Sequence, residues 1–169
     1  MLNPQEISGR RYIIAIDPGQ QGALASYNST ASPLERFKVE KLCEDPLDRV
    51  SQIKSHAEAA DLLKVARIAL VEEVGGFAGR AHPGSRMFTF GRGLGQLEGV
   101  LLTLAYSVCR VRPSSWQKDL SLLTRKGESR PEHKRRLRAR AGELFPILAP
   151  TLQTADAILI LYAFLQKQA

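Results

Sequence analysis

The sequence predicts an α/β fold with five strands, and two observations lead to that prediction. Short apolar runs of strand length are followed by longer segments in which apolar residues recur at helical spacing. The first two short runs are separated only by a turn containing Gly and Pro, which predicts a β-hairpin. The resulting order is three strands, then helix, strand, helix, strand and further helices.

The hairpin over residues 12–27 organises the rest of the chain. Its first strand is an apolar run that ends at Asp17-Pro18-Gly19. A carboxylate beside a core costs free energy unless a hydrogen-bonded turn or a metal ion compensates its charge. Both interpretations of Asp17 stay open here, because Asp before Pro-Gly is also a common turn initiator.

The next segments are a strand and a core-packing helix. Residues 35–42 alternate loosely and predict a third, antiparallel strand. Asp45-Pro46 opens a helix that runs to about residue 64. Its apolar residues predict one buried stripe, formed by Leu47, Val50, Ile53, Ala57, Ala60 and Leu63.

The next predicted strand covers residues 67–74, and its apolar run also leads into carboxylates, Glu72 and Glu73. Two buried strands that both end in acids indicate a site, because nearby strands of one sheet can bring the acids together. Side chains alternate between the two faces of a strand, so Glu72 and Glu73 point in opposite directions. Alternation alone does not choose between them.

Residues 75–93 predict a long loop, rich in Gly and without clear periodicity. Rings that stack on or wedge between bases, beside arginines that meet phosphates, are typical of nucleic-acid contact. The candidate DNA-binding residues of this loop are Phe77, Arg80, Arg86, Phe88 and Arg92. The alternative is that the phenylalanines only fasten the loop to the body of the protein.

A helix over residues 94–105 carries the candidate dimer surface. Gly95 and Gly99 lie four residues apart on one face, with Leu102 among the apolar residues. Small residues at this spacing let another helix approach closely. The alternative is intramolecular packing on the sheet.

The segment that follows this helix, residues 107–112, is predicted to form the fifth strand.

Positive charge is concentrated in the C-terminal third. The chain has a net charge of +7 and a pI near 9.7, which favours a polyanionic partner. The capping box formed by Ser129 and Glu132 begins a helix in this basic stretch. The candidate phosphate contacts are Arg125, Lys126, Arg130, Arg135 and Arg138.

The last helix, from about residue 154 to 168, is almost entirely apolar over residues 157–165 and is predicted to be buried nearly all round. Asp156 stands in its first turn. An acid there also interacts favourably with the helix dipole, by about 0.3–1 kcal/mol. A third acid at the edge of the core nevertheless favours a site.

Composition predicts an ordinary globular protein. The 169 residues favour a single domain, with a flexible N-terminus over residues 1–10. Two cysteines outside any CxxC motif indicate a reducing setting. The first residues lack the apolar core of a signal peptide, and residues 157–165 are too few to cross a bilayer. We therefore expect a cytoplasmic protein without membrane association.

With acids ending two buried strands and a third acid opening the last helix, the chain resembles the RNase H-like nucleases and, within them, the RuvC-like Holliday junction resolvases of bacteria and phages. The resemblance covers residues 12–165. Four motifs carry it: Ile16-Asp17-Pro18-Gly19 with Gly22-Ala23-Leu24-Ala25, Val71-Glu72-Glu73-Val74, Gly93-Leu94-Gly95-Gln96-x-x-Gly99, and Ala155-Asp156-Ala157. It implies a mixed sheet with the first three strands antiparallel, the last two parallel to the first, and helices on both faces.

The resemblance also implies a function. Such proteins are homodimeric, metal-dependent crossover junction endodeoxyribonucleases that resolve four-way DNA junctions by paired nicks. By the match, Asp17, Glu72 and Asp156 are metal ligands, with Glu72 preferred over Glu73. Lys118 and Lys134 fall where family members place catalytic lysines near the scissile phosphate. Phe77 falls where an aromatic residue can unstack bases at the junction centre.

One position departs from the family pattern. Members commonly carry a fourth acid or a histidine one helical turn before the final aspartate, and here that position is Gln153. An amide ligates only weakly, so one metal site is expected more firmly than two, and Glu73 or Glu143 could stand in. Oxygen ligands select Mg²⁺, with Mn²⁺ as a substitute.

Three rival interpretations remain. An ATP-binding domain of the actin and sugar-kinase type needs a second domain, for which 169 residues leave no room. A non-catalytic junction-binding protein would explain the basic helix but not the three acids. Another RNase H-like nuclease, acting on flaps or RNA–DNA hybrids, is disfavoured only by the family match.

Overall fold

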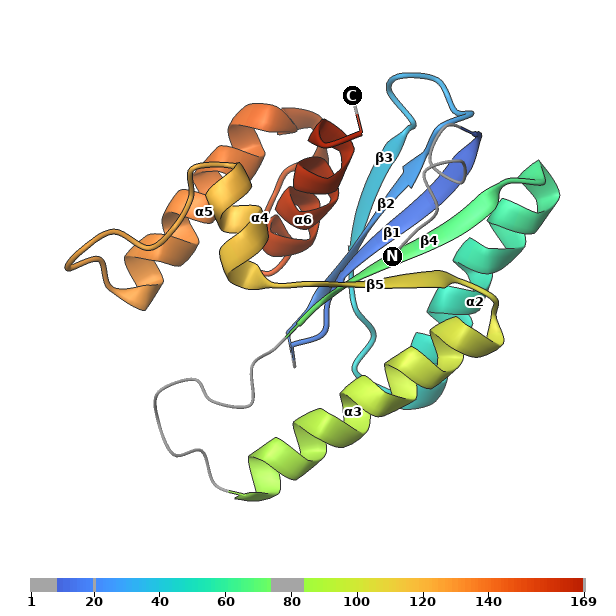
Figure 1. Ribbon diagram of the computed structural model, residues 1–169, viewed down its shortest axis with the longest axis horizontal. Helices are drawn as coiled ribbons and strands as arrows, with labels where there is room; N and C mark the ends of the chain where they lie inside the picture. Colours follow the sequence, from blue (N-terminus) through green and yellow to red (C-terminus); the bar gives the residue numbers. More distant parts are fainter. Residues whose placement is uncertain (1–8, 20, 74–83, 169) are drawn as a thin grey trace.

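The computed structural model describes residues 9–19, 21–73 and 84–168. Its centre is a five-stranded sheet with the strand order β3-β2-β1-β4-β5 (Figure 1). The strands are β1 (Arg11–Asp17), β2 (Ala23–Asn28), β3 (Phe37–Lys41), β4 (Ala66–Glu72) and β5 (Ser107–Val111). The first three strands pair antiparallel, whereas β4 runs parallel to β1 and β5 parallel to β4. The predicted α/β fold with a mixed sheet is therefore confirmed.

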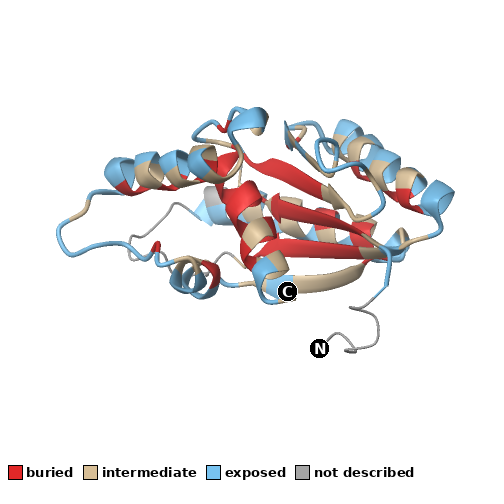
Figure 2. Ribbon diagram, turned by 90° about the horizontal axis from the view of Figure 1, so that it is seen from above, coloured by how far each residue is buried: buried red, intermediate tan, exposed pale blue. Residues whose placement is uncertain are grey.

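Helices cover both faces of the sheet, also as predicted. One face packs against α2 (Pro46–Leu63) and α3 (Gly84–Thr103). The other packs against α4 (Pro113–Asp119), α5 (Arg130–Leu144) and α6 (Ala155–Gln166), with the short 3₁₀ helix η1 (Pro146–Leu148) between the last two. Figure 2 shows the buried residues gathered in the sheet and on the sides of the helices that face it.

Strand alternation divides the core into two clusters. In β1, Ile13 and Ala15 belong to the cluster under α6, whereas Ile14 and Ile16 belong to the cluster under α2 and α3. All four side chains are fully buried. Because successive side chains of a strand point to opposite faces, the residue that follows Ile16 points toward α6. That residue is Asp17.

The prediction for α2 is confirmed at its start and is wrong about its buried stripe. Asp45 caps the helix, and its Oδ1 accepts hydrogen bonds from the backbone N–H groups of Leu47 and Asp48. The Leu47 side chain is nevertheless 77% exposed. Burial along the helix is confined to Ile53, Ala57 and Ala60, whereas the predicted stripe members Val50 and Leu63 are 39% and 36% exposed.

The predicted loop over residues 75–93 is wrong from residue 84 onward, where α3 already begins. In the first turns of α3, Phe88 and Arg92 are exposed, and the described side chains form no buried apolar stripe. Each glycine in these turns also lowers the helix propensity by about 0.5–1 kcal/mol. A pattern-based prediction therefore finds no helix there. Phe77, Arg80 and residues 1–8 of the predicted N-terminus lie outside the described residues, as does the side chain of Arg86.

The two C-terminal helices begin as predicted. The capping box of α5 is present, with the Glu132 carboxylate accepting from the Ser129 backbone N–H at 2.9 Å. Helix α6 is buried on nearly every side, as its apolar composition predicts. Within the described part of the chain, no helix combines the length and the hydropathy needed to span a membrane.

Candidate metal centre and nucleic-acid surface

Two carboxylates lie side by side where β1 and β4 end. Ile16 of β1 pairs with Val71 of β4 in parallel register, and each is followed directly by an acid. Asp17 and Glu72 therefore leave neighbouring strands at the same level and on the same face. Glu72 is only 9% exposed.

A third carboxylate reaches this point from α6. Asp156 lies in the first turn of that helix, which packs across β1 and β2, and it is 5% exposed. One oxygen from each of Asp17, Glu72 and Asp156 lies within 4.8 Å of the other two. We call these three residues the acid centre.

The turn after Asp17 holds its carboxylate in place. The Gly19 N–H donates to Asp17 Oδ1 at 3.0 Å, and the Gly22 N–H donates to the Gly19 carbonyl at 2.9 Å. A Cβ added at Gly22 would lie 2.0 Å from the Asp17 carbonyl oxygen, so only glycine fits there. The turn-former and site interpretations of Asp17 are thus compatible, because the turn engages one carboxylate oxygen and the other stays available.

The acid centre is electrostatically strained. Burial, followed by repulsion from Asp17, raises the pKa of Glu72 to about 7, and the Trp116 N–H opposes only part of this rise. Burial also raises the pKa of Asp17, against the hydrogen bond from Gly19. Asp156 Oδ1 is buried and has no hydrogen-bond partner within the described residues. The negative charge of these clustered carboxylates is not fully compensated, and oxygen ligands of this kind suit a hard divalent cation.

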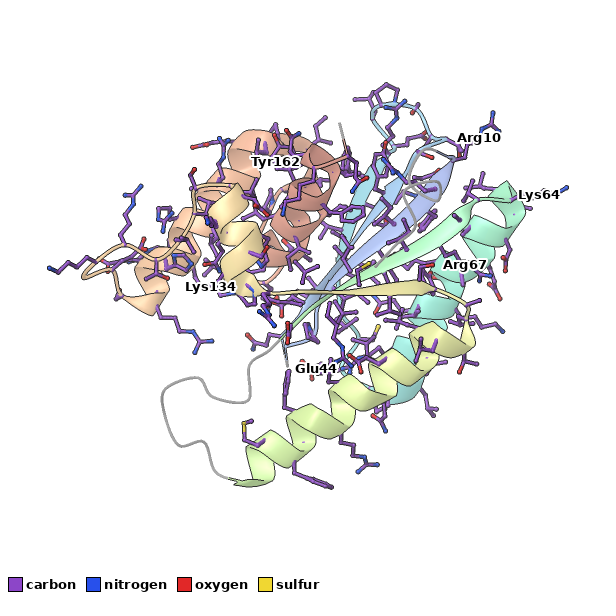
Figure 3. All side chains as sticks on the ribbon, viewed as in Figure 1. Arg10, Glu44, Lys64, Arg67, Lys134 and Tyr162 are labelled. Atoms are coloured by element: carbon purple, nitrogen blue, oxygen red, sulfur yellow. The ribbon has the colours of Figure 1, made fainter. Side chains whose placement is uncertain are left out.

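One lysine lies against the acid centre. Lys134 of α5 forms an ion pair with Asp156 Oδ2, and its side chain is 33% exposed. Figure 3 shows Lys134 beside the end of the sheet where β1 and β4 terminate. One ammonium group among three carboxylates compensates the charge only in part.

The other predicted site residues lie on α4, on α5, just after β4 and just before α6. Lys118 is exposed on α4 and lies two residues after Trp116, so the two side chains face different directions. Gln153 is half-buried in the turn that precedes α6. Glu73 and Glu143, the possible substitutes for a fourth acid, form ion pairs with Arg112 and Arg140. The roles of these residues stay predictions.

Trp116 was not among the predicted site residues, although its indole contacts Glu72. The indole N–H donates to Glu72 Oε1 at 3.0 Å, and the ring is 1% exposed. Its proximity to Lys118 in the sequence was the available signal. A large aromatic residue is predicted to lie in the core, and no local sequence pattern indicates which acceptor its indole N–H will find.

The predicted basic surface lies on and before α5. Arg125, Lys126, Arg130, Arg135 and Arg138 are all exposed. Arg138 also donates to the Pro150 carbonyl at 3.1 Å. Arg136 differs from these residues, because its side chain is 17% exposed and forms a salt bridge with Glu128. It fastens the preceding loop to the helix.

The candidate dimer surface is a free face of α3. Gly95, Gly99 and Leu102 are exposed, whereas Leu97 and Leu101 face the core. A Cβ added at either glycine would meet no atom within 4 Å. Packing of this face on the sheet, the alternative from the sequence, is therefore wrong. Phe88 and Arg92, predicted to contact DNA, are also exposed on α3.

Comparison with known proteins gives a match at the level of structure alone. No protein-family model and no curated protein sequence matches the chain. The Thermus thermophilus RuvC structure superposes with a TM-score of 0.51 at 16% sequence identity, covering 92% of this chain and 96% of the other. T. thermophilus RuvC in complex with a Holliday junction substrate gives a TM-score of 0.51 at 17% identity, covering 90% and 91%. The chain therefore has a RuvC-like, RNase H-like fold.

Proposed function

We propose that the chain is a metal-dependent, structure-selective endodeoxyribonuclease that resolves four-way DNA junctions by paired nicks. The observation that carries this proposal is the meeting of three carboxylates and a lysine at one edge of a RuvC-like sheet. The solved complex of T. thermophilus RuvC with a Holliday junction substrate supports branched DNA as the substrate class. Mg²⁺ is the proposed ion, with Mn²⁺ as a substitute, because the ligands are all hard oxygens.

The acid centre fits the chemistry of phosphodiester hydrolysis. A phosphodiester is itself negative, so attack on it requires positive charge at the phosphoryl oxygens and a water molecule of lowered pKa, and a bound divalent ion supplies both. Asp17, Glu72 and Asp156 are the residues that would hold and orient that ion. Lys134 offers a further positive charge, because its flexible stem can carry the ammonium from Asp156 to the scissile phosphate.

The basic surface supports DNA as the polyanion. Helix α5 carries Lys134 at the acid centre and also presents Arg135 and Arg138 to solvent. Positive charge thus continues from the centre along the helix, in a position to meet the phosphates that flank the cleaved bond. Replacing both arginines should weaken junction binding and make its salt dependence shallower.

The direct test is cleavage of a labelled synthetic four-way junction beside a linear duplex of the same sequence. We expect paired, symmetric nicks in the junction alone, in Mg²⁺ or Mn²⁺ and not in EDTA. Tight junction binding without nicks in either metal would contradict the nuclease and favour the non-catalytic junction-binding protein. Cleavage of flaps or RNA–DNA hybrids in preference to junctions would favour another RNase H-like nuclease.

Paired nicks in opposing strands need two active centres, so the proposal includes a homodimer formed through the free face of α3. Gly99→Leu should convert the dimer to a monomer in sedimentation velocity, because a bulky side chain then occupies the contact face. The fold of each protomer should tolerate the change, since nothing lies within 4 Å of a Cβ added at Gly99.

The matched control is Gly142→Leu on α5, where a new Cβ also meets nothing within 4 Å. Both substitutions replace a helical glycine and raise helix propensity by a similar amount, about 0.5–1 kcal/mol. Only the change on α3 should alter the sedimentation coefficient. Dimers of unchanged stability in both variants would place the subunit contact elsewhere.

A further inference from the structure

Trp116 is the single tryptophan of the chain, and its ring joins the hydrophobic core to the acid centre. It lies in the middle of the short helix α4, which follows β5 directly. The ring belongs to the core cluster under α6, while the indole N–H points at Glu72 Oε1 from 3.0 Å. A buried indole N–H requires an acceptor, and here the acceptor is a predicted metal ligand.

The surroundings of Glu72 make this contact consequential. Asp17 and Asp156 both repel the Glu72 carboxylate, and Lys134 pairs with Asp156 and not with Glu72. Trp116 is the hydrogen-bond donor that the described residues provide to this side chain. Without that donor, a flexible glutamate would turn away from the two neighbouring acids.

We propose that Trp116 is a positioning residue of the metal centre. Its N–H holds Glu72 Oε1, so the carboxylate is fixed beside Asp17 and Asp156, where it would share a cation with them. The ring itself is locked by core packing, which makes the direction of the N–H rigid. This inference rests on the proposed function only in that the acid centre must bind a divalent cation.

The prediction is a loss of metal affinity without a loss of fold. Groups that hydrogen-bond to metal ligands typically contribute 10–100-fold to metal affinity. We therefore expect Trp116→Phe to weaken Mn²⁺ binding by about 10–100-fold in isothermal titration calorimetry. Tyr12→Phe is the control for a lost buried hydrogen bond, because Tyr12 contacts His56 on the opposite face of the sheet at 2.8 Å. Its Mn²⁺ affinity should not change.

A second replacement separates the N–H from the shape of the ring. Since the chain has one tryptophan, residue-specific incorporation of an analogue changes only this position. Benzothienylalanine keeps the bicyclic shape but has sulfur in place of the N–H, whereas 4-fluorotryptophan keeps the N–H. The first protein should lose Mn²⁺ affinity to the same degree as Trp116→Phe, and the second should retain it.

A spectroscopic measurement gives a readout independent of activity. The ¹H–¹⁵N spectrum should contain one indole signal, and titration with Mg²⁺ should shift it with the dissociation constant found by calorimetry. Equal Mn²⁺ affinity of the two analogue proteins would overturn the positioning role and leave Trp116 as a core residue. Absence of Mn²⁺ binding in the unmodified protein would instead overturn the metal centre itself, and the positioning role with it.

Discussion

Two acidic sites lie on the side of the sheet that α4, α5 and α6 cover, and their electrostatic surroundings are opposite. One is Glu128, and the other is the acid centre, which contains Glu72. Glu128, whose side chain is 10% exposed, accepts hydrogen bonds from Arg136 Nε at 2.7 Å and from the Arg125 backbone N–H at 2.9 Å. Glu72 is equally buried, but its neighbours include two further carboxylates. The same residue type is thus fully compensated in one place and crowded by like charge in the other.

The pKa values follow this contrast. The Arg136 guanidinium holds the pKa of Glu128 well below its usual range, whereas burial and two neighbouring acids raise the pKa of Glu72 to about 7. A compensated acid fastens a loop to a helix and needs no ligand. A crowded acid is stable as an anion only when a cation arrives, which is the property expected of a metal centre.

The largest expected difference between the two groups is in catalysis. Asp17→Asn keeps the turn hydrogen bond but removes a charged ligand. Groups that only hydrogen-bond to a metal ligand contribute up to about 100-fold, so loss of a ligand itself should lower junction cleavage by more than about 100-fold. Junction binding should persist. Glu128→Gln should instead lower the thermal midpoint while Mn²⁺ affinity stays unchanged. If Asp17→Asn cleaves at the normal rate, Asp17 has no part in the site.

The second difference is in the pH dependence of stability. The pKa of Glu72 is raised from 4.5 to about 7 in the folded protein, so the native state favours the protonated acid. In EDTA the free energy of unfolding should therefore fall as pH rises from about 4.5 through 7, by about 3 kcal/mol at most. The raised pKa of Asp17 acts in the same direction.

Urea unfolding at several pH values measures this slope, and Glu72→Gln should flatten it. Glu128 has the opposite sign, because its lowered pKa contributes stability above its unfolded pKa that is lost in acid. Saturating Mn²⁺ should remove the fall in stability toward pH 7, since the ion stabilises the ionised form. A slope that is identical in wild type and Glu72→Gln would show that the acid centre is not strained.

The smallest effect is expected at Lys134, which pairs with the acid centre as Arg136 pairs with Glu128. Lys134 competes with the metal for Asp156, and its side chain is partly exposed. Lys134→Met should therefore strengthen Mn²⁺ binding by about fivefold, equivalent to about 1 kcal/mol, while cleavage becomes slower. Weaker Mn²⁺ binding in this variant would mean that Lys134 supports the metal site and does not compete for it.

Local sequence signals predicted the elements well where a cap or a buried stripe marks them. Asp45 and Ser129 begin helices as predicted, because side-chain caps are local interactions. The same signals failed where apolar residues are exposed. The N-terminal part of α3 contains Gly91 and Gly93 and its described side chains form no buried stripe, and Leu47 in the first turn of α2 is exposed although its spacing predicts burial.

The sequence by itself determined which residues end the buried strands and begin the buried helix, because apolar runs and their terminating acids are local features. Tertiary structure decided which face those acids share. The parallel register of Ile16 with Val71 sets Glu72, and not Glu73, beside Asp17, and the packing of α6 on that face adds Asp156. Trp116 is the clearest case, since a hydrogen bond spanning 44 positions depends on where α4 docks and not on any local pattern.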